Sequence, residues 1–215
     1  MPSPVSRIIY LHGFASSPFS SKARFFQERF AQLGIGLDIP DLSEGNFERL
    51  TITGQLNVIE RAAAGEPVCL MGSSMGGYLA ALYAARHPEV EKLVLLAPAF
   101  SFPTRWPEEL GESKMEEWRR TGRLPVFHYG EGRTMNLGYQ LIEDGSNYEA
   151  YPKSMQPALI FQGKNDTVVP PIFAKNWAAQ HPEATLHLLN SDHQLLNVLD
   201  EMWIESEHFL FGLRS

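Results

Sequence analysis

The chain has 215 residues, and 44 % of them are hydrophobic, which is enough to bury one sizeable core but too little for two ordinary enzyme domains. Its 25 acidic residues outnumber 18 basic ones, giving a formal charge of −7. No excess of positive charge is available to neutralise a phosphate backbone or an anionic membrane surface, so we expect neither nucleic acid nor membrane as a partner. One domain over residues 1–215 is the expectation.

The number of cysteines and the N-terminal sequence indicate a cytoplasmic location, and they exclude disulfides and thiolate metal clusters within one chain. Cys69 is the single cysteine, so one chain can form neither an internal disulfide nor a thiolate metal cluster. The chain starts without the charged and apolar regions of a secretion signal, and no stretch reaches the roughly 18 apolar residues of a membrane-spanning helix. Neither a P-loop nor a dinucleotide-binding glycine pattern is present. We therefore expect a cytoplasmic protein that needs no metal or other cofactor.

Short apolar runs alternate along the chain with segments of helical periodicity. Near-continuous apolar runs suit strands of a parallel sheet whose two faces are both covered by helices. Strands are predicted at residues 7–11, 36–40, 68–72, 93–97, 158–163 and 184–189. Helices are predicted at residues 23–33, 55–64, 75–86, 171–180 and about 195–210. The predicted fold class is α/β, with a mostly parallel sheet of about six strands.

Residues 100–152, called the cap segment below, interrupt this alternation, because they are rich in Trp, Tyr, Gly and charge. A helix is predicted at residues 107–120 and a hairpin at residues 126–129 and 134–137. We expect the segment to be an insertion that covers the carboxyl edge of the sheet. Its aromatic residues are as compatible with an acyl pocket as with a core of the cap itself. These residues are Phe102, Trp106, Trp118, Phe127, Tyr129 and Tyr139.

The strongest local motif is Gly-Ser-Ser-Met-Gly at residues 72–76, which fits G-x-S-x-G between a predicted strand and a predicted helix. A side chain at either glycine would collide with neighbouring backbone as so sharp a turn closes. Ser74 has a glycine two positions away on both sides, whereas Ser73 does not. An ordinary Gly/Ser turn is the alternative, but the order of strand, turn and helix favours Ser74 as a nucleophile.

A serine nucleophile needs a histidine base that is oriented by a carboxylate. Asp166 follows one predicted strand and His193 follows the next, so both fall at the carboxyl edge of the sheet, where active-site groups of such sheets collect. The chain order Ser74, Asp166, His193 is that of the α/β-hydrolases. Asp192 is the rival acid, and we expect it to cap the last helix instead.

A negative charge that develops on a carbonyl oxygen needs preorganised donors. The backbone N–H of Met75, directly after the nucleophile, is one candidate. The N–H of Phe14 is the second, because Gly13 lets the first loop approach the substrate. His12 in the same loop is expected to shape the loop rather than to act as a second base. His128 in the cap segment is within possible reach of the pocket, and its role is left open.

With these residues in place, the chain resembles the α/β-hydrolase superfamily from His12 to His193. The stretch LHGFASSP at residues 11–18, followed by SKA at residues 21–23, is similar to that of small bacterial esterases of the YqiA and YcfP type. The fold of this superfamily usually begins with two further strands, which have no counterpart in the sequence before residue 7. The resemblance therefore implies the fold with a trimmed sheet.

The resemblance also implies hydrolase activity and a role for each site residue. It gives Ser74 as nucleophile, His193 as base, Asp166 as orienting acid, and Phe14 with Met75 as the oxyanion hole. We expect a carboxylesterase that acts on small-molecule acyl substrates through an acyl-enzyme. A thioesterase or an amidase with the same triad is the nearest alternative, and a non-catalytic binding module on the same fold is a third. The oligomeric state has no signature in the sequence.

Overall fold

The computed structural model describes residues 7–212, and its centre is a six-stranded sheet in the order β2-β1-β3-β4-β7-β8. All neighbouring strands of this sheet pair in parallel. The strands are β1 (Ile8–Leu11), β2 (Leu37–Asp38), β3 (Val68–Ser73), β4 (Val90–Leu96), β7 (Ala158–Gly163) and β8 (Ala184–Leu189). The predicted α/β class and all six predicted strands are confirmed. Residues 1–6, in which no secretion signal was recognised, lie outside the described residues.

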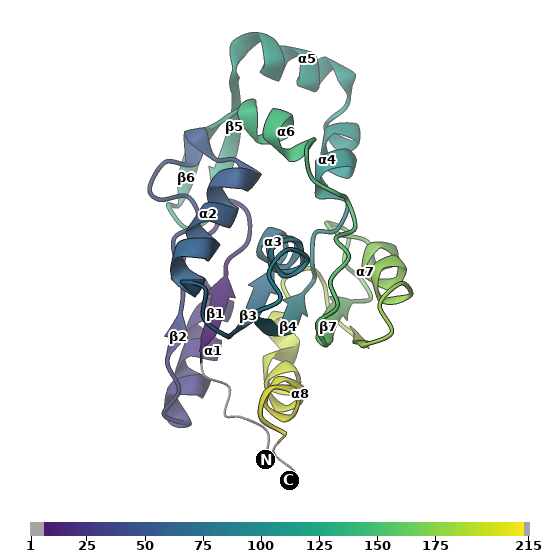
Figure 1. Cartoon of the computed structure of the whole chain (residues 1–215). Coiled ribbons are helices and arrows are strands. Elements are labelled where there is room, and N and C mark those ends of the chain that lie inside the picture. The colour runs from purple at the N-terminus through teal and green to yellow at the C-terminus, as the bar shows by residue number, and fades with distance from the viewer. Residues whose placement is uncertain (1–6, 213–215) are drawn as a thin grey trace.

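Helices cover both faces of the sheet (Figure 1). They are α1 (Ser21–Gln32), α2 (Ile52–Ala63), α3 (Met75–Ala84), α7 (Pro171–Ala178) and α8 (Leu199–Phe211). In β1, Ile8 and Tyr10 pack into the cluster with α1 and α8, while Ile9 and Leu11 pack into the cluster with α2, α3 and α7. In β1 and β3 every position is buried, so these strands are apolar at nearly every position rather than at alternate ones.

The cap segment lies between β4 and β7 in the chain and rises beyond the sheet in Figure 1. It consists of α4 (Phe102–Leu110), α5 (Glu112–Thr121), β5 (Arg123–His128), β6 (Arg133–Gly138) and α6 (Gln140–Gly145). Strands β5 and β6 pair antiparallel, as the predicted hairpin requires. The prediction of a single helix at residues 107–120 is wrong. Gly111 stands between two helices with φ 78° and ψ 158°, a conformation that is open to glycine and ends α4.

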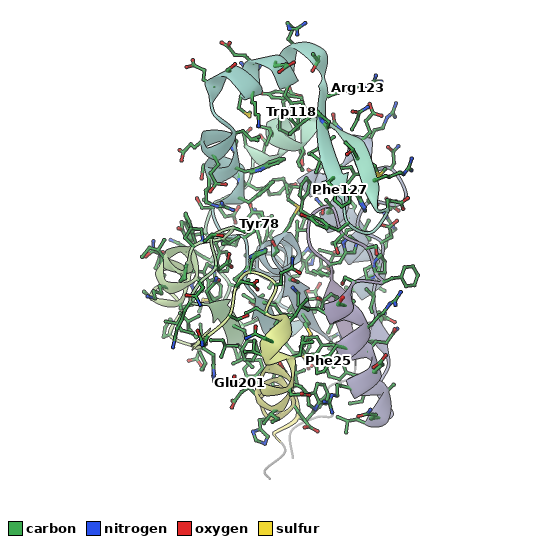
Figure 2. All side chains as sticks on the ribbon, turned by 180° about the vertical axis from the view of Figure 1, so that it is seen from behind. Phe25, Tyr78, Trp118, Arg123, Phe127 and Glu201 are labelled. Atoms are coloured by element: carbon green, nitrogen blue, oxygen red, sulfur yellow. The ribbon has the colours of Figure 1, made fainter. Side chains whose placement is uncertain are left out.

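Aromatic side chains form a core within the cap segment. Trp118 is only 1 % exposed, and its Nε1 donates a hydrogen bond of 2.9 Å to the carbonyl of Leu137. Its ring meets those of Trp106 and Tyr139 edge to face, at centroid distances of 5.5 and 5.4 Å. Figure 2 shows Trp118 inside this part of the molecule, far from Phe25 on α1 and Glu201 on α8. No helix among residues 7–212 is both long enough and apolar enough to cross a membrane.

Replacing Trp118 by Ala tests whether the cap segment folds together with the sheet. We expect the free energy of unfolding to fall by about 3–5 kcal/mol, because a buried indole and its hydrogen bond are lost. Phe127→Ala is the control in the same segment, since that side chain is 49 % exposed and its loss should change stability by about 0.5 kcal/mol or less. Urea denaturation followed by circular dichroism measures both. Equal stability of the two variants would contradict a cooperative cap.

Candidate active site

Ser74 forms the turn between β3 and α3 with φ 53° and ψ −116°, which is an unfavourable region for any residue other than glycine. The backbone around it is held in place by hydrogen bonds. Its N–H donates to the carbonyl of Leu96 at 2.8 Å, and its carbonyl accepts from the N–H groups of Gly77, Tyr78 and Ala99. The strained turn is therefore fixed by β4 and α3, and it presents Ser74 at the carboxyl edge of the sheet.

Two glycines make this turn sterically possible. A Cβ atom on Gly72 would lie 2.2 Å from the carbonyl oxygen of Gly76. A Cβ atom on Gly76 would lie 2.1 Å from the carbonyl oxygen of Leu11 at the end of β1. Real Cβ atoms do not approach backbone so closely, so α3 can begin at this distance from β1 and β3 only with glycine at both positions.

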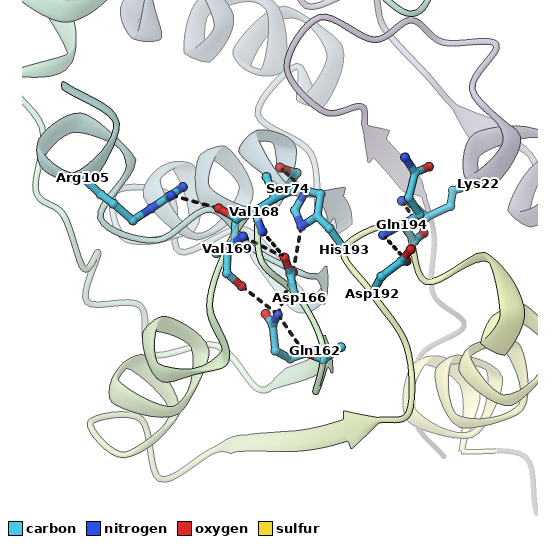
Figure 3. Close-up of polar contacts among 11 residues, drawn as sticks. Lys22, Ser74, Arg105, Gln162, Asp166, Val168, Val169, Asp192, His193 and Gln194 are labelled. Atoms are coloured by element: carbon cyan, nitrogen blue, oxygen red, sulfur yellow. Dashed lines mark hydrogen bonds and ion pairs between the residues drawn. The ribbon is translucent and has the colours of Figure 1, made fainter. Parts of the chain in front are cut away.

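The structure brings Ser74, His193 and Asp166 into one chain of hydrogen bonds (Figure 3). His193 Nε2 lies 3.1 Å from Ser74 Oγ, and His193 Nδ1 lies 2.8 Å from Asp166 Oδ2. The side chain of Asp166 is fully buried and that of His193 is 19 % exposed. When Nδ1–H donates to the carboxylate, Nε2 is left as the acceptor for the serine hydroxyl. This is the geometry of an activated serine.

Asp166 is held as a buried carboxylate by several donors. Its Oδ1 accepts from the N–H groups of Val168 and Val169 at 2.9 and 2.8 Å, and its Oδ2 also accepts from Gln162 Nε2 at 2.8 Å. Burial by itself raises the pKa of Asp166. Together, the hydrogen bond and charge of His193 and the donors from Val169 and Gln162 outweigh burial and hold this pKa below its ordinary value. The group is therefore ionised at neutral pH.

Two supporting residues were not predicted from the sequence. Gln162 is fully buried, and its Nε2 also donates to the carbonyl of Val169 at 3.1 Å. A carboxamide inside the apolar strand β7, four residues before Asp166, was the available signal. Arg105 comes from α4 and donates to the carbonyl of Val168 at 2.9 Å. No local pattern marks that contact, because 63 residues separate its partners.

Asp192 does not cap the last helix, and that expectation was wrong. Its Oδ1 accepts from the N–H of Gln194 at 2.9 Å, so the carboxylate closes a local turn beside His193. Helix α8 begins only at Leu199, after a 3₁₀ turn at Leu196–Val198, and has no side-chain cap at its N-terminus.

Neither of the other two histidines singled out from the sequence contacts Ser74. His12 Nε2 accepts from the N–H of Leu42 at 3.1 Å and Nδ1 donates to the carbonyl of Gly13 at 3.0 Å, so His12 shapes the loop as expected. His128 is 5 % exposed, packs edge to face on Phe47, and accepts from the N–H of Glu131. Burial lowers the pKa of His128, which therefore lies neutral in the hairpin corner.

Phe14 and Met75 lie beside Ser74, and their backbone N–H groups have no acceptor among the described residues. Both residues line one pocket together with Ser74. Within residues 7–212 neither N–H donates a hydrogen bond, and the Met75 N–H has no acceptor in α3 because it belongs to the first turn of that helix. Two donors are thus available next to Ser74.

Two pockets meet at Ser74. The larger, called the polar pocket, has a volume of about 610 Å³ and is lined by serine hydroxyls, Lys22, Tyr129 and His193. The smaller, called the aromatic pocket, has a volume of about 220 Å³ and is lined by Met75, Phe102 and Trp106 among others. Among residues 7–212 no group of three His, Cys, Asp or Glu side chains is arranged to hold a metal ion.

The aromatic residues of the cap segment therefore divide between the two roles that the sequence left open. Phe102 and Trp106 line the aromatic pocket, and Tyr129 lines the polar pocket. Trp118 and Tyr139 are buried in the core of the cap, with Trp106 against them. Phe127 is half exposed and lines neither pocket.

Comparisons with known proteins agree with this fold. The uncharacterised protein family UPF0227 matches residues 7–209. A putative hydrolase from Agrobacterium vitis S4 is similar with a TM-score of 0.82 and 25 % identity, over 97 % of this chain and 90 % of that one. Alpha/beta hydrolase domain-containing protein 10 from mouse is similar with a TM-score of 0.80 and 20 % identity, over 98 % of this chain and 91 % of that one. A monoacylglycerol lipase of Paleococcus ferrophilus is similar with a TM-score of 0.74 and 15 % identity, over 97 % of this chain and 95 % of that one. No curated protein matches the chain.

A pair of alanine substitutions tests the steric requirement at the turn. Gly76→Ala should lower the free energy of unfolding by about 3 kcal/mol or more, or prevent folding, because the new methyl group meets the carbonyl of Leu11. Gly13→Ala is the matched control, since its Cβ would make ordinary contacts of 3.4 and 3.5 Å with Ser73 and Ser74. Soluble yield and denaturant unfolding report both. A Gly76→Ala protein as stable as Gly13→Ala would refute the close approach.

Proposed function

The chain belongs to the uncharacterised protein family UPF0227, and we propose that it is a serine hydrolase that cleaves carboxylic esters of small acyl groups. The observation that carries the proposal is the continuous contact from Ser74 Oγ through His193 to the buried carboxylate of Asp166. The fold supports it, because hydrolases of this fold place such a serine at the turn after a central strand. The monoacylglycerol lipase among the structural neighbours adds support for an ester substrate.

The first half-reaction forms an acyl-enzyme. Ser74 Oγ attacks the carbonyl carbon of the ester while His193 Nε2 removes its proton, and Asp166 stabilises the imidazolium that results. The carbonyl oxygen becomes negatively charged and accepts hydrogen bonds from the N–H groups of Phe14 and Met75. The tetrahedral intermediate then collapses. The bond to the leaving alcohol breaks, and His193 returns its proton to that oxygen.

The second half-reaction uses water in place of the alcohol. His193 removes a proton from a water molecule that attacks the acyl carbon on Ser74, and the carboxylic acid leaves as the serine regains its proton. No metal or other cofactor takes part in these steps. The aromatic pocket next to Met75 is the proposed place for the acyl group, since apolar side chains such as Phe102 and Trp106 form much of its wall and its volume of about 220 Å³ favours short chains.

Ser74→Ala is the direct test. Turnover of short-chain p-nitrophenyl esters should fall by at least about 10⁴-fold, because the attacking oxygen is gone while the rest of the site remains. Stability should be nearly unchanged, which denaturant unfolding checks. The neighbouring serine provides the control: Ser73→Ala protein should still be labelled covalently at Ser74 by a fluorophosphonate probe, and Ser74→Ala should not. Undiminished turnover by Ser74→Ala would refute the mechanism.

Matched substrates separate the esterase from its alternatives. An oxygen ester, a thioester and an amide that share one short acyl group differ only in the leaving atom. We expect the oxygen ester to be cleaved with a much higher kcat/KM than the amide, since an amine leaves less readily than an alcohol. A higher kcat/KM for the thioester would make the protein a thioesterase with the same triad. Folded protein that cleaves none of the three and reacts with no probe would be a binding module.

A further inference from the structure

The two pockets differ in which part of the substrate they can hold. His193 lines the polar pocket and not the aromatic pocket, whereas Met75 lines the aromatic pocket and not the polar pocket. Because His193 Nε2 must protonate the leaving oxygen, the leaving group has to depart on the side of His193. The polar pocket therefore receives the leaving group, and its chemistry selects the alcohol rather than the acyl chain.

The wall of the polar pocket is positively charged. Lys22 and Arg24 both line it, and no Asp or Glu is among its lining residues. Within residues 7–212 neither cation has a carboxylate oxygen within 4 Å. Lys22 Nζ donates one hydrogen bond, of 2.8 Å, to the carbonyl of Gln194, which leaves two of its protons for another acceptor. Figure 3 shows Lys22 and Arg105 on opposite sides of the pair formed by Ser74 and His193.

Lys22 is held where its charge is poorly solvated. Burial lowers the pKa of Lys22 to about 8, although the negative charges of Asp192 and Asp166 act in the opposite direction. Those two carboxylates are already engaged, Asp192 with the N–H of Gln194 and Asp166 with His193. Lys22 is half-buried and has no ion-pair partner among the described residues, so an anion that enters the pocket would stabilise the charged lysine.

The start of helix α1 also suits an anion. Helix α1 begins at Ser21, beside the pocket, and its N-terminus carries a partial positive charge. Ser21, Lys22 and Arg24 all line the pocket, so the charge of the helix start adds to the charges of the two basic side chains.

We propose that the leaving group of the natural substrate is an alcohol or thiol that carries a carboxylate or a phosphate, bound in the polar pocket by Lys22 and Arg24. The inference rests on the proposed function, because that function defines which side of Ser74 the leaving group occupies. It narrows the substrate class from small acyl esters in general to acyl esters of an anionic alcohol or thiol. The reaction releases this anion together with the carboxylic acid.

Acetate esters with matched leaving groups test the inference. The carboxylate pair is 4-acetoxybenzoate and its neutral analogue 4-acetoxybenzamide, and the phosphate pair is 4-acetoxyphenyl phosphate and 4-acetoxyanisole. We expect kcat/KM to be at least about tenfold higher for the anionic member of one pair or both. Whichever pair shows the larger ratio identifies carboxylate or phosphate as the preferred anion. Ratios near one in both pairs, with turnover that depends on Ser74, would overturn the inference and leave the proposed function standing.

Variants that remove one positive charge test whether Lys22 and Arg24 cause the preference for anionic esters. In Lys22→Gln and Arg24→Gln the ratio of kcat/KM between the anionic and neutral esters should fall about tenfold, mainly through a higher KM for the anionic ester. Lys114→Gln, an exposed lysine on α5, removes the same charge elsewhere and should keep the wild-type ratio. A ratio that responds equally to all three substitutions would show a general charge effect and would refute a specific site.

A binding measurement keeps the inference testable if no ester is turned over, which would contradict the proposed function. Calorimetric titration of the protein with 4-hydroxybenzoate and phenyl phosphate should show binding that is at least tenfold weaker in the Lys22→Gln variant. The neutral 4-hydroxybenzamide should bind more weakly than either anion. Equal affinity for all three compounds would refute an anion-binding pocket independently of catalysis.

Discussion

Much of this molecule depends on the contact between Gly76, at the start of α3, and the carbonyl of Leu11, at the end of β1. Because no side chain stands between them, α3 packs directly against the end of the strand. The same close approach fixes the backbone of Ser74 on one side. On the other side it fixes the loop that carries Phe14, three residues after Leu11. Ser74 and the backbone N–H groups of Phe14 and Met75 are thus positioned by one backbone contact, before the side chains of His193 and Asp166 are considered.

The parts that could be predicted from the sequence are those encoded by neighbouring residues. Strand β3 is apolar at almost every position because both of its faces are buried, and it is marked by Gly72 near its end and by Gly76 three residues after its end. Asp166 and His193 could be found because parallel strands bring their carboxyl ends to one edge. The break at Gly111 was missed, since the apolar spacing of α4 and α5 continues across it and only the backbone conformation reveals two helices.

Long-range contacts account for what sequence reasoning missed in the site. Gln162 and Arg105 both act on the loop that holds Asp166, but one lies inside a strand and the other lies in the cap. The separation of a polar from an aromatic pocket also has no local signature, because residues from four separate stretches of the chain line each of them. Lys22 illustrates the same point. Its sequence neighbours are ordinary for a helix start. Its place in the pocket is set by His193 and Gln194, which are far away in the chain.

The polar pocket is positively charged, although the net charge of the chain is −7. The attraction of the pocket for anions therefore acts only at short range, within a Debye length of about 8 Å at physiological salt.

The cap segment leaves the sheet after β4 and leads back to β7, and its two ends are joined by a hydrogen bond of 2.8 Å from the N–H of Ser101 to the carbonyl of Ala150. An insertion whose two ends are held side by side can be lengthened, shortened or exchanged without moving any strand. The pocket that Phe102 and Trp106 line can therefore change its shape as such proteins evolve, without any change at Ser74, His193 and Asp166. One contact limits this freedom: Arg105 supports the loop of Asp166, so a transplanted cap has to bring an equivalent donor with it.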